Sequence, residues 1–228
     1  MASSEPKAGR SERRTDALSK ERIVEAAIEL LDAEGESGLT FRALAARLAT
    51  GSGAIYHHVA NKNDLLTAAT DDVIARVLAG VVPDEQPRAA IRSVALGMFD
   101  AIDLHPWVGT HLAREPWQLA LPQILEGLGG PLQALGVPEQ AQFDCASALF
   151  NYVLGVAGQN AAHARLHADA TDRTTFLTSI VARWTRLDPA RYPFVHRMAA
   201  QLREHDDREQ FLAGIDLILD GAGRGQAR

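Results

Sequence analysis

Apolar residues recur every three to four positions along most of the chain, the spacing that places them on one face of an α-helix. The first helix is predicted to begin after Ser19, a good N-terminal cap, and to end near Glu34, before Gly35 and Gly38. Its buried face is predicted to comprise Ile23, Ala27, Leu30 and Leu31.

Residues 40–80 are predicted to form three further helices. Thr40 caps the second, a turn covers residues 50–53, and the third spans residues 54–59. Asn61 caps the fourth, with Asp64 placed as in a capping box, and this helix ends near Gly80. The inward-facing residues are predicted to be Phe41, Leu44, Leu48, Ile55, Val59, Leu65, Leu66, Ala69, Val73 and Val77.

The rest of the chain keeps the helical pattern after a break marked by Pro83 and Pro87. Helices are predicted near 87–104, 107–114, 118–135, 138–168, 171–187, 190–203 and 207–221. A helix break is expected within Gly127–Pro131. Because no run of alternating β-branched residues or hairpin turn occurs, the predicted fold class is all-α.

The segment from Leu39 to Leu66 has the layout of a helix-turn-helix. Ala45 is small enough to let two helices approach closely, and glycines stand in the turn. The short helix after the turn carries Tyr56, His57 and His58 away from its apolar positions, and Lys62 follows. Such an exposed polar face predicts binding to the major groove of duplex DNA. The alternative is an ordinary helical hairpin within a bundle.

The charge of the chain is unevenly distributed. The 228 residues carry a formal net charge of −6, with 46% hydrophobic residues, enough for a core. Residues 1–62 are neutral, with nine Lys/Arg and nine Asp/Glu, whereas residues 63–228 hold fourteen and twenty. Residues 1–17 are predicted to be a disordered basic arm, which either contacts phosphates or is simply solvated. Its basic residues include Lys7, Arg10, Arg13 and Arg14.

The sequence has no sign of secretion or membrane insertion. Its one cysteine, Cys145, cannot form an intramolecular disulfide and has apolar neighbours that predict a buried thiol. No run approaches the ~18 apolar residues of a membrane span, and the polar N-terminus does not resemble a signal peptide. A cytoplasmic location is expected.

Three motifs then carry a resemblance to a known family: IVEAAIELLDAEG, GLTFRALAARLA and GAIYHHVANKNDLL. In this order and spacing, the segment from Ile23 to Asp72 resembles the DNA-binding domain of the TetR/AcrR family of bacterial regulators. The resemblance implies an N-terminal three-helix helix-turn-helix DNA-binding domain, here 18–80, plus a C-terminal helical ligand-binding and dimerisation domain, here 81–228. It also implies a homodimer that binds operator DNA and is most often a repressor released by a small molecule.

The resemblance assigns roles to individual residues of the first domain. Thr40 would hold a phosphate, Arg42 a base edge or phosphate, and Lys62 a phosphate. His58 would pack inside the domain. The start and exposed face of the recognition helix would approach bases or backbone through Ser52, Gly53, Ala54, Tyr56 and His57.

The turn departs from the family pattern. Where relatives have Gly-Val-Ser-Pro, this chain has Ala49-Thr50-Gly51-Ser52. A left-handed conformation at Ala49 would cost roughly 1 kcal/mol, and Gly51 replaces the serine cap. The start of the recognition helix is therefore expected to be defined only to about one residue.

The second domain resembles one subgroup of the family more loosely, through HPWVGTHLAREP and FNYVLGVAGQNAAHAR. The predicted ligand pocket combines aromatic and polar side chains, the alternative being ordinary core or interface. It comprises Met98, Phe99, Ile102, Trp107, His111, Trp117, Asn151, Tyr152 and Gly155. The helix 138–168 and the last helix are predicted to form the dimer interface, the alternative being packing on their own core. The last helix would contribute Phe211, Leu212, Ile215, Ile218 and Leu219.

No pattern of catalytic or metal-ligating residues is found. His163 and His167 are four apart, but no cysteine or carboxylate nearby completes a metal set. Gly51 and Gly53 follow no strand, so they are not a nucleotide fingerprint. No nucleophile–base pair or cofactor motif occurs, so neither a cofactor nor enzymatic activity is expected. The alternatives to a repressor are a DNA-binding activator or architectural factor, or a small-molecule-binding protein or enzyme with a vestigial head.

Overall fold

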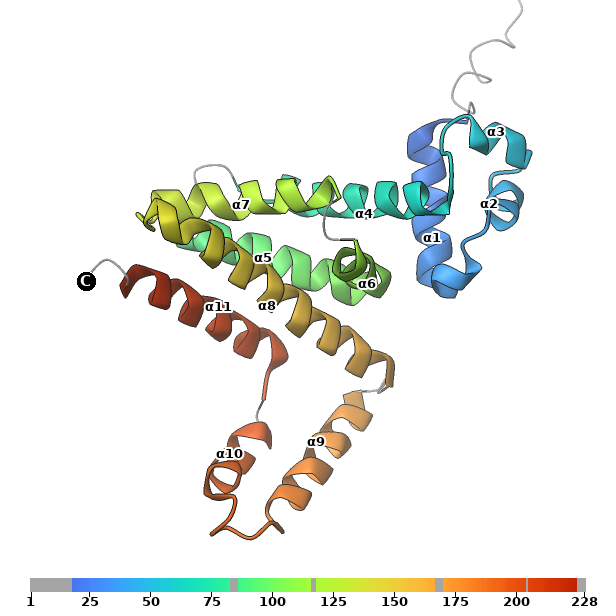
Figure 1. Cartoon of the computed structure of the whole chain (residues 1–228). Helices are drawn as coiled ribbons and strands as arrows, with labels where there is room; N and C mark the ends of the chain where they lie inside the picture. The colour runs from blue at the N-terminus through green and yellow to red at the C-terminus, as the bar shows by residue number, and fades with distance from the viewer. Residues whose placement is uncertain (1–17, 83–85, 116–117, 167–169, 204, 225–228) are drawn as a thin grey trace, which may run out of the picture. The chain divides into compact units, whose positions relative to one another are not determined.

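The computed structural model describes residues 18–82, 86–115, 118–166, 170–203 and 205–224. These residues form eleven helices and no β-strand, in agreement with the predicted all-α class (Figure 1). The predicted basic arm 1–17, Trp117 and His167 lie outside the described residues. Packing divides the chain after Asp72 into two compact units. This boundary lies within the helix Lys62–Ala79, whereas the predicted boundary lies after the end of that helix, at residue 80.

The first unit contains α1 (Lys20–Gly38), α2 (Phe41–Arg47), α3 (Ser52–Tyr56) and the beginning of α4 (Lys62–Ala79). Its core brings together side chains that are at most 1% exposed, from all four helices. They are Ile23, Ala27, Leu31, Leu44, Ile55, Leu65 and Ala69. The helical spacing read from the sequence therefore identifies the core correctly, because each of these helices buries one face.

The caps of the first unit also follow the sequence. The backbone N–H of Arg22 donates to the Ser19 hydroxyl at 3.3 Å, and Gly35 interrupts α1 with a φ of 68°. The N–H of Asp64 donates to Asn61 Oδ1 at 2.9 Å, while the Asn61 amide donates to Asp64 Oδ2 at 3.0 Å. Side chains thus satisfy backbone groups that helix ends leave free.

The second unit holds the end of α4 and seven further helices. They are α5 (Pro87–Leu104), α6 (Pro106–Arg114), α7 (Ala120–Ala134), α8 (Glu139–Leu166), α9 (Ala170–Trp184), α10 (Pro193–Arg203) and α11 (Asp207–Arg224). Helix α5 packs against α6, α7, α8 and α11, and α8 also packs against α6, α7 and α11 (Figure 1). Helices α9 and α10 pack against each other.

Two sequence predictions on helix bounds were wrong. Helix α7 continues through the predicted break, with Pro131 inside it. The recognition helix was expected at 54–59, but α3 begins at Ser52 and ends at Tyr56. The N–H groups of His58 and Val59 both donate to the Ile55 carbonyl, at 2.9 and 3.1 Å, which closes the helix in a turn. Val59 still faces inward, with 5% exposure.

Candidate nucleic-acid interface and cavity

Thr40 begins α2 and has the geometry of an N-cap. Its side-chain oxygen accepts a hydrogen bond from the Ala43 N–H at 3.1 Å, and its carbonyl accepts from the Leu44 N–H at 2.9 Å. The residue is exposed. Because a hydroxyl both accepts and donates, the capping bond leaves its O–H free to donate to an anion at the helix N-terminus.

The turn after α2 is a Schellman motif with alanine in the position that glycine usually takes. Thr50 N–H donates to the Ala45 carbonyl at 3.0 Å, and Ala49 N–H donates to the Ala46 carbonyl at 3.3 Å. Ala49 has a φ of 51°, which confirms the left-handed conformation considered from the sequence. The left-handed conformation of Ala49 costs about 1 kcal/mol, which these two hydrogen bonds offset.

Helix α3 presents small groups at its start. Gly51 caps it without a side-chain hydrogen bond, and Ile55, fully buried, anchors the helix to the core. Gly53 is exposed, and a Cβ placed there would meet no atom of the described chain within 4 Å. Since glycine weakens a helix by roughly 1 kcal/mol relative to alanine, close approach by another molecule is a better reason for Gly53 than internal packing.

Tyr56 lies at the end of α3 and stacks on Phe41 of α2. The ring centroids are 4.3 Å apart and the planes differ by 6°. Tyr56 remains 54% exposed, and Phe41, which was expected to be buried, is only half-buried. The stack orients the phenol on the outer surface, a contact between two helices that the sequence pattern did not predict.

The residues after Tyr56 are also on the surface. His57 and His58 are both exposed, so the expectation that His58 packs inside the domain was wrong. The reason is that α3 ends at Tyr56 rather than at residue 59, so both histidines lie in the turn after the helix, where they are exposed.

Lys62 has a partner within its own unit. Its ammonium donates to the Glu36 carbonyl near the end of α1. An ammonium has three donors, so this bond leaves others for the phosphate contact predicted for Lys62. The interaction adds a structural role that sequence reasoning missed.

The two arginines of α2 are in different situations. Arg47 pairs with Glu29, with Nη2 and Oε2 2.6 Å apart. Arg42 is exposed and has no ion pair with the residues that the structure describes. Arg42 is therefore the cation of α2 that is available to an anionic partner.

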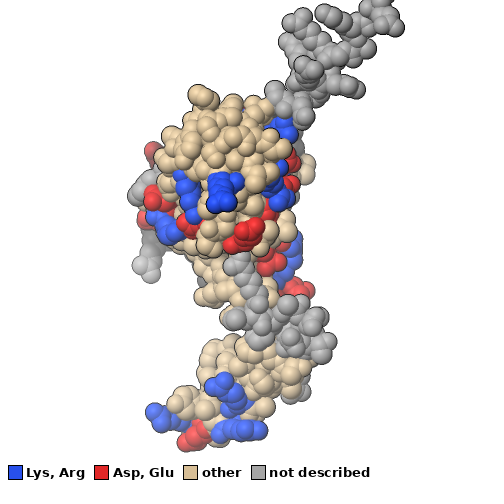
Figure 2. Space-filling view, turned by 90° about the vertical axis from the view of Figure 1, so that its right-hand side faces the viewer, with Lys and Arg blue, Asp and Glu red and all other residues tan. Residues whose placement is uncertain are grey.

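The face containing α1–α3 is not a continuous basic patch. Figure 2 shows Lys and Arg interspersed with Asp and Glu beside a broad uncharged area. At the start of α1, hydrogen bonds from its own backbone N–H and from Ser19 lower the pKa of Glu21. Affinity for nucleic acid must then come from a few placed cations, hydroxyls and backbone N–H groups rather than from net charge.

In the second unit, most of the predicted pocket residues belong to the core. Five of them, on α5 and α6, are at most 6% exposed: Met98, Phe99, Ile102, Trp107 and His111. Tyr152 is half-buried, and Asn151 and Gly155 are exposed on α8. Their assignment to a ligand pocket stays a prediction.

A cavity of about 530 Å³ lies between the end of α4, α5 and α7. None of the eight described pocket predictions lines it. Its lining residues are Leu78, Val81, Ala90, Val94, Pro122, Gln123, Glu126, Gly127 and Pro131. Seven of these nine are aliphatic, proline or glycine, which is why a search for aromatic and polar residues missed them.

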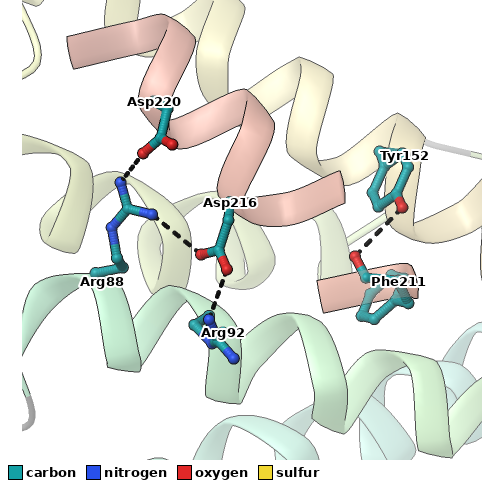
Figure 3. Close-up of polar contacts among 6 residues, drawn as sticks. All are labelled: Arg88, Arg92, Tyr152, Phe211, Asp216 and Asp220. Carbon is teal, nitrogen blue, oxygen red and sulfur yellow. Dashed lines mark hydrogen bonds and ion pairs between the residues drawn. The ribbon is translucent and has the colours of Figure 1, made fainter. Parts of the chain in front are cut away.

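Helix α11 is held tightly by its own chain (Figure 3). The Tyr152 hydroxyl donates to the Phe211 carbonyl at 3.2 Å. The Phe211 ring also contacts the rings of Phe99 and Tyr152, with centroids 4.7 and 5.6 Å away. Burial raises the pKa of Tyr152, which keeps the hydroxyl a donor. These contacts dock the start of α11 onto α5 and α8.

Ion pairs dock the rest of α11. Arg88 contacts Asp216 at 3.1 Å and also Asp220, and Arg92 contacts Asp216 at 2.7 Å (Figure 3). The hydrogen bond with Asp220 raises the pKa of Arg88. Both arginines of α5 are thus committed to α11.

This docking corrects the dimer assignment for three residues. Phe211, Ile215 and Leu219 are at most 4% exposed within a single chain, so their surface is not available to a partner chain. Leu212 and Ile218 are half-buried, and Leu217, which was not predicted, is 73% exposed. The wide apolar band of α11 therefore serves mainly the core of its own chain.

His163, one of the two histidines spaced four apart, lies among the described residues. His163 is exposed, and the part of the chain that the structure describes contains no group of three metal-ligating side chains.

Cys145 is 7% exposed, and burial raises the pKa of its thiol. No described helix is both long and apolar enough to traverse a bilayer.

The fold and the surface around α2 and α3 define a helix-turn-helix transcriptional regulator. Residues 23–69 match the family described as bacterial regulatory proteins, tetR family. The transcriptional regulator SCO7222, a TetR from Streptomyces coelicolor, is 51% identical, with a TM-score of 0.84 over 91% of this chain and 99% of that one. The chain therefore belongs to the TetR family of DNA-binding transcriptional regulators.

Two more distant relatives agree with this assignment. The HTH-type transcriptional repressor DrrR1 of Streptomyces coeruleorubidus is 29% identical over 90% of this chain and 77% of its own length. The apo structure of ActR from Streptomyces coelicolor is 22% identical and has a TM-score of 0.75, covering 92% of this chain and 98% of that one. At this identity, ActR supports the fold only.

Proposed function

We propose that this protein is a repressor that binds a near-palindromic operator as a homodimer and is released by a small molecule. The observation that carries the proposal is the surface formed by Thr40, Arg42 and Tyr56 on α2 and α3, in a chain of this family. A relative is named a repressor, BioQ of Mycobacterium smegmatis has been solved with its double-stranded DNA operator, and ActR has been solved with actinorhodin.

On the operator, some of these residues would contact phosphates and others would approach the bases. Thr40 and Lys62 would hold phosphates and set the position of the unit on the backbone. Ser52, Gly53, Ala54 and His57 would approach base edges or backbone with Tyr56, and Arg42 would bind a guanine edge or a phosphate. The phenol of Tyr56 is already oriented by the stack on Phe41, so little side-chain freedom is lost on binding.

For the dimer, the exposed faces of α8 and α11 are the best candidates. Phe143 is 71% exposed on α8 and Leu217 is 73% exposed on α11, and Asn151 and Gly155 are exposed on α8. Large apolar side chains exposed beside small residues favour a helix–helix interface. A dimer would present two recognition helices to half-sites roughly 34–36 Å apart, or a multiple of that.

The small molecule would bind the cavity of the second unit and weaken DNA binding. By linkage, saturating DNA must then weaken ligand binding by the same factor. The protein would act in the cytoplasm on chromosomal DNA, and we propose no catalytic activity for it.

The direct test is a titration against the DNA flanking its own gene at two salt concentrations. Arg42→Gln and Tyr56→Ala should each weaken binding at least tenfold, and affinity should fall steeply with salt. Arg191→Gln, which removes an exposed cation from the second unit, is the matched control. Equal affinity for random DNA, or unchanged binding in both variants, would contradict the proposal.

A further inference from the structure

The cavity of the second unit offers hydrogen-bond acceptors in an apolar wall. Seven of its nine described lining residues are apolar, and Gln123 and Glu126 of α7 supply the polar side chains. Its volume of about 530 Å³ suits a drug-sized molecule. We propose that this cavity binds a lipophilic amine in its protonated form, which deepens the proposed ligand response by naming the class of ligand.

Gln123 provides the first acceptor. Its side-chain oxygen is buried and, within the described chain, has no hydrogen-bond partner. A buried acceptor is unfavourable unless it receives a hydrogen bond. A ligand N–H or O–H placed in the cavity would satisfy this oxygen.

Proline also interrupts the hydrogen bonding of α7 beside the cavity. Pro131 lies inside the helix and has no N–H, so it cannot donate to the Gly127 carbonyl one turn earlier. Gly127 and Pro131 both line the cavity. This carbonyl therefore lacks its ordinary helical donor.

Glu126 supplies the charge. Glu126 lines the cavity and is exposed, and none of the nine lining residues that the structure describes is Lys, Arg or His. The nearby cations of α5, Arg88 and Arg92, are paired with Asp216 and Asp220 of α11. The cavity therefore favours a cation and disfavours a carboxylate or phosphate, because a buried charge requires an opposite charge.

Three probes with the same ring system separate charge from shape. We would measure binding of 1-naphthylmethylamine, 1-naphthalenemethanol and 1-naphthaleneacetic acid to the whole protein by calorimetry at neutral pH. The amine should bind at least tenfold more tightly than the acid, with the alcohol between them. Glu126→Gln should reduce the preference for amine over acid to under threefold, whereas Asp144→Asn, an exposed carboxylate on α8, should leave it unchanged.

Two further variants test whether the probes bind in this cavity. Gln123→Leu should weaken the amine and the alcohol but not the acid, and Val94→Trp should abolish binding of all three by filling the cavity. Thermal unfolding would check that each variant is folded, and Gln123→Leu still tests the site if Val94→Trp does not fold. Binding of the acid equal to that of the amine, an unchanged preference in Glu126→Gln, or binding of none of the probes would overturn the proposal.

Operator release is measured separately on the same preparations. If the amine binds with the expected preference but operator affinity does not change, the proposed ligand response is wrong and the ligand class stands. If operator binding is normal and the amine preference is absent, the ligand class is wrong and DNA recognition stands.

Discussion

Ala49 and Gly136 occupy the same position of the same helix-ending motif in the two units. In each case the next residue donates to a carbonyl five positions back: Thr50 to Ala45 at 3.0 Å, and Val137 to Leu132 at 3.1 Å. The φ angles are 51° for Ala49 and 77° for Gly136. Glycine adopts this conformation without strain and alanine does not, so the chain contains its own matched comparison.

Ala49→Gly should therefore stabilise the first unit. Relief of the left-handed strain outweighs the greater freedom of glycine in the unfolded chain, and we expect a gain of about 0.5–1 kcal/mol. Gly136→Ala should lower the free energy of unfolding by about 1 kcal/mol. Urea denaturation measures both, and a loss of stability in Ala49→Gly would contradict the expected strain.

Tyr56 combines a contact within the chain with a proposed contact to DNA, and two substitutions separate them. Tyr56→Phe keeps the stack on Phe41 and removes the hydroxyl, so stability should change by less than about 0.5 kcal/mol while operator affinity falls about tenfold. Tyr56→Ala should also lower stability, by roughly 0.5–1.5 kcal/mol. Denaturation and DNA titration on the same samples check this, and full operator affinity in Tyr56→Phe would exclude a role for the hydroxyl.

At the scale of elements, caps and prolines made the helix bounds predictable from the sequence. The packing partners of each helix could not be predicted in this way. Helix α5 was predicted with the observed bounds because Pro87 suits a first helical position. The side that α11 buries could not be read from its sequence, because an apolar band looks the same whether its own core or a second chain covers it. Contacts between residues distant in sequence, such as Lys62 with Glu36, leave no periodic signal.

The docking of α11 should depend more on Asp216 than on Asp220. Asp216 binds both Arg88 and Arg92, whereas Asp220 binds Arg88. These groups are partly exposed, so Asp216→Asn should lower the free energy of unfolding by about 1 kcal/mol and Asp220→Asn by about 0.5 kcal/mol. The difference should shrink in high salt, as screening predicts. Equal losses of stability in both variants would show that the second ion pair of Asp216, with Arg92, does not stabilise the fold.

For the whole molecule, the uneven charge distribution predicts where salt sensitivity arises. Replacing Lys7, Arg10, Arg13 and Arg14 with Gln should reduce the slope of log affinity against log salt by up to about 0.9 for each lost phosphate contact. Replacing Arg183, Arg186, Arg191 and Arg197 with Gln removes the same charge from the second unit and should leave the slope unchanged. An unchanged slope in the first variant would mean that residues 1–17 do not contact DNA.

The burial of Cys145 has an experimental use. Cys145 is the one cysteine of the chain, it is 7% exposed, and burial raises the pKa of its thiol. A thiol-specific reagent should therefore modify it mainly when α8 opens locally. The modification rate then reports the breathing of the second unit without any added label. A ligand that binds the closed unit should slow the reaction, so candidate effectors can be ranked by alkylation rate before their operator is known.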